Sequence, residues 1–252
     1  MFDLDAVPAL CAREITAIAD RARDLSAVEW SRPIPFLPGW TIGDLVDHAA
    51  RASGQQAVAI ENGLRGSDEQ PAFPHPEPRA REAVLDAMSA GRDALVEALT
   101  KITPDDLGRT TPMPFGVVPT PVATTIAVLE YAFHRWDLER ALDADSGYDL
   151  PDDIAPHALE FLMGFVPVMA AGGIPPTRAL TIALRTPAAE SRIGFDGTAW
   201  APSTASPDCT VIGSASDLTM FTLGRVGSDA AAIEVAGDRS IAEQFKSYAP
   251  GP

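Results

Sequence analysis

The chain has 252 residues, 46% of them hydrophobic and 21% charged, and a formal net charge of −16 at pH 7. This composition is typical of a folded globular protein with one large or two small domains. The negative charge repels phosphate backbones and anionic lipid surfaces, so neither nucleic acid nor a membrane is an expected partner.

The two cysteines, Cys11 and Cys209, form no paired motif, and each is expected to be a packed thiol. The N-terminal segment carries acidic residues early and has no basic region before an apolar core, unlike a signal peptide. No apolar run is expected to span a membrane. These features favour a cytoplasmic location.

Apolar residues spaced three and four apart predict helices over the first two thirds of the chain. The expected helices cover residues 2–25, 41–62, 79–102 and 121–143, with one further helix at 152–170. Segments 31–39 and 103–121 are proline-rich connections, and 63–79 is a loop. Thr41 and Asp44 form a capping box at the start of the second helix. Four long helices joined by loops indicate a bundle.

The sequence changes character after AAGGIPPT at 170–177. Short β-rich runs predict strands at 179–186, 191–195, 209–213 and 232–237. Helices are expected at 214–224 and 238–247. The predicted fold class is therefore α+β, with a helical bundle over residues 1–170 and a small domain of mixed strands and helices over residues 171–252.

Glu130 and His134 stand out within the fourth helix. Between Thr125 and Arg135 they are the only ionisable residues apart from Tyr131. A four-residue step places both side chains on one helical face. An unpaired buried carboxylate is costly, and a divalent metal would supply a partner.

A third ligand must come from another segment, and the chain has four histidines. His75 lies among prolines and is expected in an exposed loop, while His157 is expected at a surface or a helix cap. His48 lies on the apolar side of the second helix, which can face the fourth in an antiparallel bundle. His48, Glu130 and His134 would leave coordination positions open, as catalytic metal sites do.

Ordinary structural roles explain the same residues equally well from spacing alone. His48 could pair with Asp44 four residues earlier on a solvated helix face. Glu130 could form a buried ion pair with Arg135 or Arg140.

The residues that flank the pair leave similar choices open. Asp137 could orient His134 through the second ring nitrogen, or be a surface acid near Arg140. Trp136 is expected to pack or to line a pocket, and Trp40 is expected in the core rather than as a substrate platform.

Four segments resemble a known family. GWTIGDLVDHAA resembles the second-helix signature of the mycothiol-dependent maleylpyruvate isomerase family, within the DinB-like superfamily. LEYAFHRWDLERAL resembles its E-x3-H-x-WD element. PDCTVIGSASDLTMFTLGR and IEVAGDRSIAEQF resemble its C-terminal domain, which is similar to sterol-carrier folds. The resemblance covers nearly the whole chain in order.

The resemblance implies a DinB-like four-helix bundle that binds a divalent metal, usually zinc, followed by a sterol-carrier-like α/β domain. Matched by motif, the implied metal ligands are His48, Glu130 and His134. Arg225 in FTLGR matches an arginine that the family associates with activity. Mycothiol or a similar low-molecular-weight thiol is the implied cosubstrate.

The resulting hypothesis is an enzyme in which the metal activates this thiol to attack an electrophilic small molecule. Addition followed by elimination gives a cis–trans isomerase, whereas a stable adduct gives an S-transferase. Arg225 could bind a substrate carboxylate. A metal-dependent hydrolase that activates water, and a non-catalytic protein that binds a metal or an apolar ligand, are the alternatives.

Overall fold

The computed structural model describes residues 1–72, 80–144 and 147–250, and it divides into two compact units, Met1–Tyr148 and Asp149–Pro252. The first unit is mainly helical, and the second contains a mixed five-stranded sheet with helices. The expected α+β fold class is confirmed. His75 lies outside the described residues, so its expected loop position stays a prediction.

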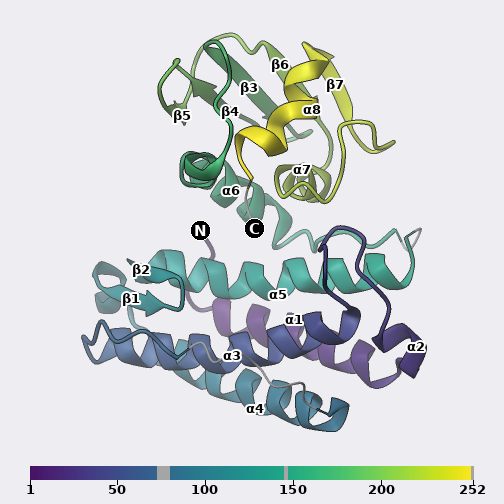
Figure 1. Ribbon diagram of the computed structural model, residues 1–252. Helices are drawn as coiled ribbons and strands as arrows, with labels where there is room; N and C mark the ends of the chain where they lie inside the picture. Colours follow the sequence, from purple (N-terminus) through teal and green to yellow (C-terminus); the bar gives the residue numbers. More distant parts are fainter. Residues whose placement is uncertain (73–79, 145–146, 251–252) are drawn as a thin grey trace. The chain divides into compact units, whose positions relative to one another are not determined.

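The long helices of the first unit form a bundle (Figure 1). They are α1 (Val7–Arg23), α3 (Ile42–Leu64), α4 (Arg81–Thr100) and α5 (Thr120–Leu142). Helix α3 packs against α4 and α5, and α1 packs against the same two helices. Each predicted helix is therefore present with small differences at its ends, and α3 and α5 are neighbours, as the proposed ligand set requires.

The first unit contains short elements that the sequence did not predict. Helix α2 (Ala27–Trp30) begins at a capping box between Ser26 and Glu29. Strands β1 (Thr110–Met113) and β2 (Gly116–Pro119) form a hairpin before α5, within the segment interpreted as a proline-rich connection. The short 3-10 helix η1 (Pro104–Gly108) precedes the hairpin.

The start of α3 is fixed by the predicted capping box. The Thr41 hydroxyl accepts a hydrogen bond from the Asp44 N–H at 3.2 Å, and the Asp44 carboxylate accepts one from the Thr41 N–H at 2.8 Å. These bonds satisfy N–H groups that have no partner within the helix. Because His48 lies about two turns into α3, the cap also helps to set the position of its side chain.

Replacing Thr41 with alanine is expected to lower the free energy of unfolding by about 1 kcal/mol, the typical cost of losing an N-cap side chain. Urea unfolding followed by circular dichroism measures this difference. A loss below about 0.5 kcal/mol would mean that the cap contributes little to the stability of the bundle.

The second unit places five strands in the order β5-β4-β3-β6-β7. They are β3 (Leu180–Arg185), β4 (Glu190–Phe195), β5 (Trp200–Pro202), β6 (Cys209–Ile212) and β7 (Glu234–Gly237). Strand β3 pairs parallel to β6, and the other pairs are antiparallel. Helices α6 (Ala155–Met169), α7 (Ala215–Thr222) and α8 (Arg239–Tyr248) complete the unit, with the 3-10 helix η2 (Ala170–Gly172) after α6. The short strand β5 was not predicted.

The boundary between the units differs from the expected division at 170/171. Helix α6, which was assigned to the bundle, belongs to the second unit. Its residues Leu159, Met163 and Val166 lie in one hydrophobic core with the sheet. The apolar pattern of a helix shows that one face is buried, but not which core receives it, and this explains the displaced boundary.

Among the described residues, one segment, Ala155–Gly172, has the length and composition of a membrane-spanning helix, with a mean hydropathy of 1.2. No such segment was expected from the sequence. The segment is mostly α6, whose apolar residues enter the core of the second unit. A core helix passes the same test of length and composition, so this segment is weak evidence for a membrane span.

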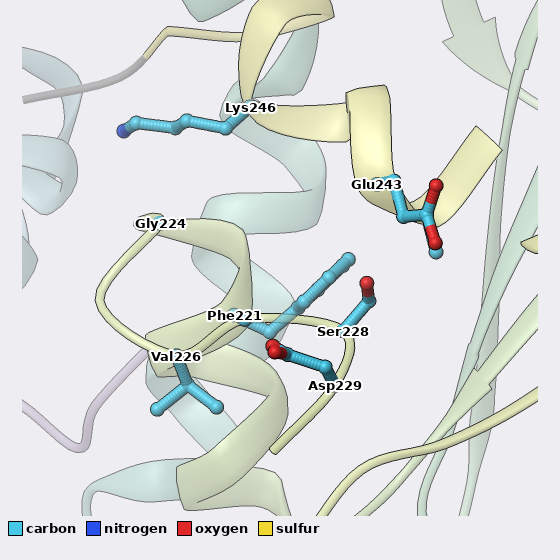
Figure 2. Close-up of a pocket in the computed structure, with 9 residues that line it drawn as sticks. Phe221, Gly224, Val226, Ser228, Asp229, Glu243 and Lys246 are labelled. Atoms are coloured by element: carbon cyan, nitrogen blue, oxygen red, sulfur yellow. The ribbon is translucent and has the colours of Figure 1, made fainter. Parts of the chain in front are cut away.

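The second unit also contains a cavity of about 430 Å³ beside α7 and α8. Phe221 and Val226 line it together with the charged residues Asp229, Glu243 and Lys246. Figure 2 shows the side chain of Lys246 extending away from Glu243 and Asp229. Burial, and then the nearby charge of Arg225, lower the pKa of Lys246 to about 8.

Candidate metal centre

Helix α5 is buried along most of its length, and two ionisable residues lie on one of its faces. Glu130 and His134 are one turn apart, and their side chains are 24% and 12% exposed. Neighbouring residues such as Leu129 and Tyr131 are buried. The two polar side chains are therefore held among apolar groups but remain accessible from one side.

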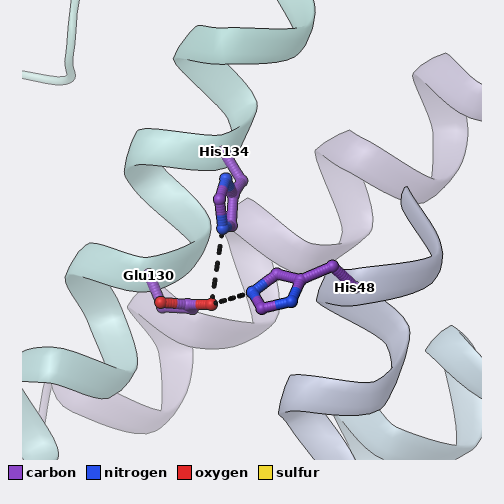
Figure 3. Close-up of side chains that lie close together, drawn as sticks. All are labelled: His48, Glu130 and His134. Carbon is purple, nitrogen blue, oxygen red and sulfur yellow. Dashed lines mark hydrogen bonds and ion pairs between the residues drawn. The ribbon is translucent and has the colours of Figure 1, made fainter. Parts of the chain in front are cut away.

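His48 of α3 meets this pair (Figure 3). Its Nε2 lies 2.8 Å from Glu130 Oε1, and the Nε2 of His134 lies 3.4 Å from the same oxygen. One potential ligand atom from each of the three residues lies within 4.8 Å of the others. The structure thus brings together the three side chains that the sequence selected from two separate helices.

The competing roles for His48 and Glu130 do not occur. Asp44 caps α3 through Thr41 and is exposed, while His48 contacts Glu130 instead. Within the described ranges, the ion pairs of Glu130 are with the two histidines.

The arginines proposed as partners of Glu130 have other contacts. Arg135 forms an ion pair with the buried Glu14 of α1 at 3.0 Å. Arg140 lies over the ring of Trp136 and donates a hydrogen bond to the carbonyl of Ala144. No arginine side chain is needed to explain the half-buried position of Glu130.

Asp137 has the orienting position that was one of its two predicted roles. Its Oδ2 lies 3.2 Å from His134 Nδ1, and its side chain is fully buried, so the surface interpretation is wrong. A carboxylate at Nδ1 favours a proton on that nitrogen in the neutral ring, which leaves Nε2 as a lone-pair donor facing Glu130.

Glu130 and His134 stabilise each other's charged forms. Burial opposes the ionised form of Glu130, but hydrogen bonds with His134 and His48 outweigh it and hold the carboxyl pKa well below its usual range. Burial also disfavours the His134 imidazolium, yet hydrogen bonds with Asp137 and Glu130 raise its pKa to about 9. Glu130 is therefore an anion at neutral pH, as a metal ligand must be.

Trp40 completes the surroundings, although the sequence indicated a core position. Its half-buried ring lies 5.1 Å from the ring of His48 and 6.4 Å from that of His134, measured between centroids. The two imidazoles are 5.0 Å apart and nearly perpendicular. Helical periodicity could not reveal this role, because Trp40 precedes α3 and lies in a connection. Trp136, by contrast, is packed as expected, with Phe36 against it at 5.3 Å.

The remaining residues singled out in the sequence belong to other elements. Arg225 follows α7 in the second unit, is half-buried, and donates its backbone N–H to the carbonyl of Met220. Cys11 and Cys209 are buried, and burial raises the pKa of both thiols, which confirms them as packed residues. His157 is half-buried near the start of α6.

The donor set fits a divalent transition metal. Two imidazole nitrogens and one carboxylate oxygen form a combination that zinc uses in catalytic sites. Ligand atoms bound at about 2 Å in a tetrahedron are roughly 3.4 Å apart, near the separations of 2.8 and 3.4 Å between the histidine nitrogens and Glu130. Three side chains could thus hold such an ion with only small movements.

Comparison with known proteins gives a consistent result. The family model for the mycothiol maleylpyruvate isomerase N-terminal domain matches residues 11–139, which include all three proposed ligands. A crystal structure of the mycothiol-dependent maleylpyruvate isomerase aligns with a TM-score of 0.66 and 17% identity, covering 93% of each chain. A histidine-to-alanine mutant of that isomerase aligns with a TM-score of 0.66, 16% identity and the same coverage.

These identities establish a shared fold. No protein with a curated description matches the chain. Since the family model spans half of the sequence, the chain belongs to the family of proteins with the mycothiol maleylpyruvate isomerase N-terminal domain.

Proposed function

We propose that this protein is a metal-dependent enzyme that uses a low-molecular-weight thiol of the mycothiol type to transform an electrophilic small molecule. Isomerisation is the favoured reaction, because the protein with the similar fold is named as a mycothiol-dependent maleylpyruvate isomerase. The observation that carries the proposal is the meeting of His48, Glu130 and His134 at one point, inside the segment matched by the family model.

In this proposal His48, Glu130 and His134 hold the cation, and zinc is the metal that best fits two imidazoles and a carboxylate. When bound, such an ion lowers the pKa of a coordinated thiol and so supplies a thiolate nucleophile at neutral pH. Asp137 contacts Nδ1 of His134, so Nε2 of the same ring would remain available to bind the cation. Buried apolar residues of α3 and α5 limit the access of water to the site.

Arg225 is proposed to bind a carboxylate of the substrate. The family resemblance associates the arginine in FTLGR with activity. A guanidinium binds a carboxylate through two parallel hydrogen bonds.

Replacing Arg225 with glutamine is expected to raise the KM for a carboxylate substrate by at least about tenfold, because a charge-assisted bond contributes roughly 1.5–3 kcal/mol. Steady-state kinetics measures this change. The zinc content of the variant should equal that of the wild type, and an unchanged KM would refute the role.

Three reaction classes are separated by one assay. The zinc-loaded protein is incubated with maleylpyruvate in the presence and absence of mycothiol, and the products are analysed by mass spectrometry and chromatography. An isomer of unchanged mass that forms only with thiol supports the isomerase. A stable thiol adduct indicates the S-transferase, and a hydrated product without thiol indicates the hydrolase. The proposal would be overturned if no product forms under any condition and if the protein, as purified before zinc is added, contains no zinc.

A further inference from the structure

Three rings meet beside the proposed ligands. The Trp40 indole is close to parallel to the His134 imidazole, with an interplanar angle of 21°. It meets the His48 imidazole edge to face, at 67°. Both arrangements are favourable for aromatic pairs whose centroids lie between about 4.5 and 7 Å. One side chain therefore contacts both imidazoles, which come from different helices.

The segment that carries Trp40 is hydrogen-bonded to both α3 and α5. The backbone carbonyl of Trp40 accepts a hydrogen bond from Ile34 N–H at 2.9 Å. Ile42 N–H, at the start of α3, donates to the Arg32 carbonyl at 2.9 Å. The Arg32 guanidinium donates to the carbonyl of Leu142, at the end of α5, at 2.7 Å. Hydrogen bonds thus connect the start of α3 and the end of α5 through this segment.

The contacts restrict the rings in a specific way. An imidazole can rotate about its bond to the side chain, and only some orientations direct Nε2 to Glu130. For His134, Asp137 already restrains the ring at Nδ1. For His48, the polar and ring contacts among the described residues are with Glu130 at Nε2, the Trp40 ring and the His134 ring. The indole is therefore a neighbour that restrains His48 independently of the other ligands.

We propose that Trp40 is a positioning residue of the metal centre, which holds the imidazoles of His48 and His134 with their Nε2 atoms directed at Glu130 and thereby raises the affinity for a divalent cation. The inference rests on the proposed metal site. It assigns to a connecting residue a role that neither the ligand set nor the fold requires.

The test compares Trp40→Leu, Trp40→Phe and wild type in two measurements on the full chain. Competition with a chromophoric chelator gives the affinity for Zn²⁺, and the visible absorption of bound Co²⁺ reports the geometry of its ligands. Trp40→Leu should bind Zn²⁺ about 10- to 100-fold more weakly, the usual effect of removing a group that orients a ligand. Its Co²⁺ spectrum should also change. Trp40→Phe keeps a flat ring and should restore most of the affinity.

Trp30 offers a matched control. It is also a half-buried tryptophan of the first unit, and it packs over Gly43 in the first turn of α3. The guanidinium carbon of Arg81 lies 5.1 Å from the centroid of the Trp30 ring, so this ring contacts an arginine rather than the two histidines. Trp30→Leu should therefore bind Zn²⁺ like the wild type, and thermal unfolding of the metal-free proteins shows how much each leucine variant destabilises the bundle.

The outcomes separate the inference from the proposed function. A wild type that binds neither Zn²⁺ nor Co²⁺ defeats the proposed function. A wild type that binds both, with equal Zn²⁺ affinity and an unchanged Co²⁺ spectrum in Trp40→Leu, defeats only the role of Trp40. If Trp40→Leu does not fold, Trp40→Met replaces it, since its flexible chain fills space without a flat face. Equal losses in the Trp30 and Trp40 variants would also refute positioning.

Discussion

Replacing Glu130 with glutamine is expected to abolish the metal content of the purified protein and, with it, thiol-dependent turnover. The amide keeps the size of the side chain but removes the anionic oxygen that faces both histidines. Loss of a group that only orients a ligand weakens metal binding by about 10- to 100-fold, so loss of a ligand should exceed about 100-fold. Elemental analysis and a Zn²⁺ titration measure the effect.

Glu139 supplies the control for this experiment. It lies on the same helix with a similar exposed fraction, 22% against 24%, and it forms an ion pair with Arg21. Glu139→Gln should retain the full metal content and activity. His48→Ala should resemble Glu130→Gln, because the third ligand comes from α3. Undiminished metal in both Glu130→Gln and His48→Ala would remove these residues from the centre.

Thermal stability gives a second measurement on Glu130→Gln and Glu139→Gln. A cation that binds the folded chain, and not the unfolded chain, stabilises the fold by about 2.7 kcal/mol at a concentration 100 times its Kd. A chelator should therefore lower the Tm of the wild type and of Glu139→Gln but leave that of Glu130→Gln unchanged.

Much of this fold follows from periodicity in the sequence. The long helices and four of the five strands of the sheet occur near the predicted positions, because amphipathic spacing reports which face is buried. The hairpin β1–β2 was missed because it contains two prolines, Pro112 opposite Val117 and Pro119 opposite Thr110. Proline lacks an N–H for strand pairing, so both residues indicated a loop. Helix α2 had a readable signal, the spacing of Ser26 and Glu29, but its four residues give no periodicity.

The candidate site was predictable to a different extent. Spacing placed Glu130 and His134 on one face. The link to His48 followed from its apolar helix face and the packing expected in an antiparallel bundle, and the family resemblance implied the same three residues. The sequence offered Glu130 as a partner for Arg135, because it could not reveal the ion pair that Arg135 forms with Glu14, 121 positions away in the chain. Trp40 was misjudged for the same reason: ring contacts with residues on two helices depend on where a connecting segment crosses them.

The apparent affinity for Zn²⁺ is expected to rise by about tenfold per pH unit from pH 7 to pH 9 and then to level off. In the metal-free protein the pKa of His134 is raised from 6.5 to about 9, so its ring is protonated at neutral pH. A histidine ligand must be neutral, and each cation bound below that pKa displaces this proton. Titrations with a pH-characterised competing chelator give the slope.

The stability of the metal-free protein should change in the opposite direction. A raised folded-state pKa contributes stability that is fully present below the unfolded value of about 6.5 and is lost as pH rises through about 9. The Tm of the chelator-treated protein should therefore fall between those pH values while the affinity for Zn²⁺ rises, since both follow the same proton.

Asp137→Asn separates this explanation from a general effect of pH on the fold. The amide removes the negative charge at Nδ1 that raises the pKa of His134, so the rise in affinity should end at a lower pH than in the wild type. An affinity that stays constant from pH 7 to pH 9 in the wild type, or that levels off at the same pH in both proteins, would contradict the prediction. Because His134 is a proposed ligand and Asp137 contacts its other nitrogen, the two pH profiles measure how strongly a buried carboxylate adjusts the ligand that it orients.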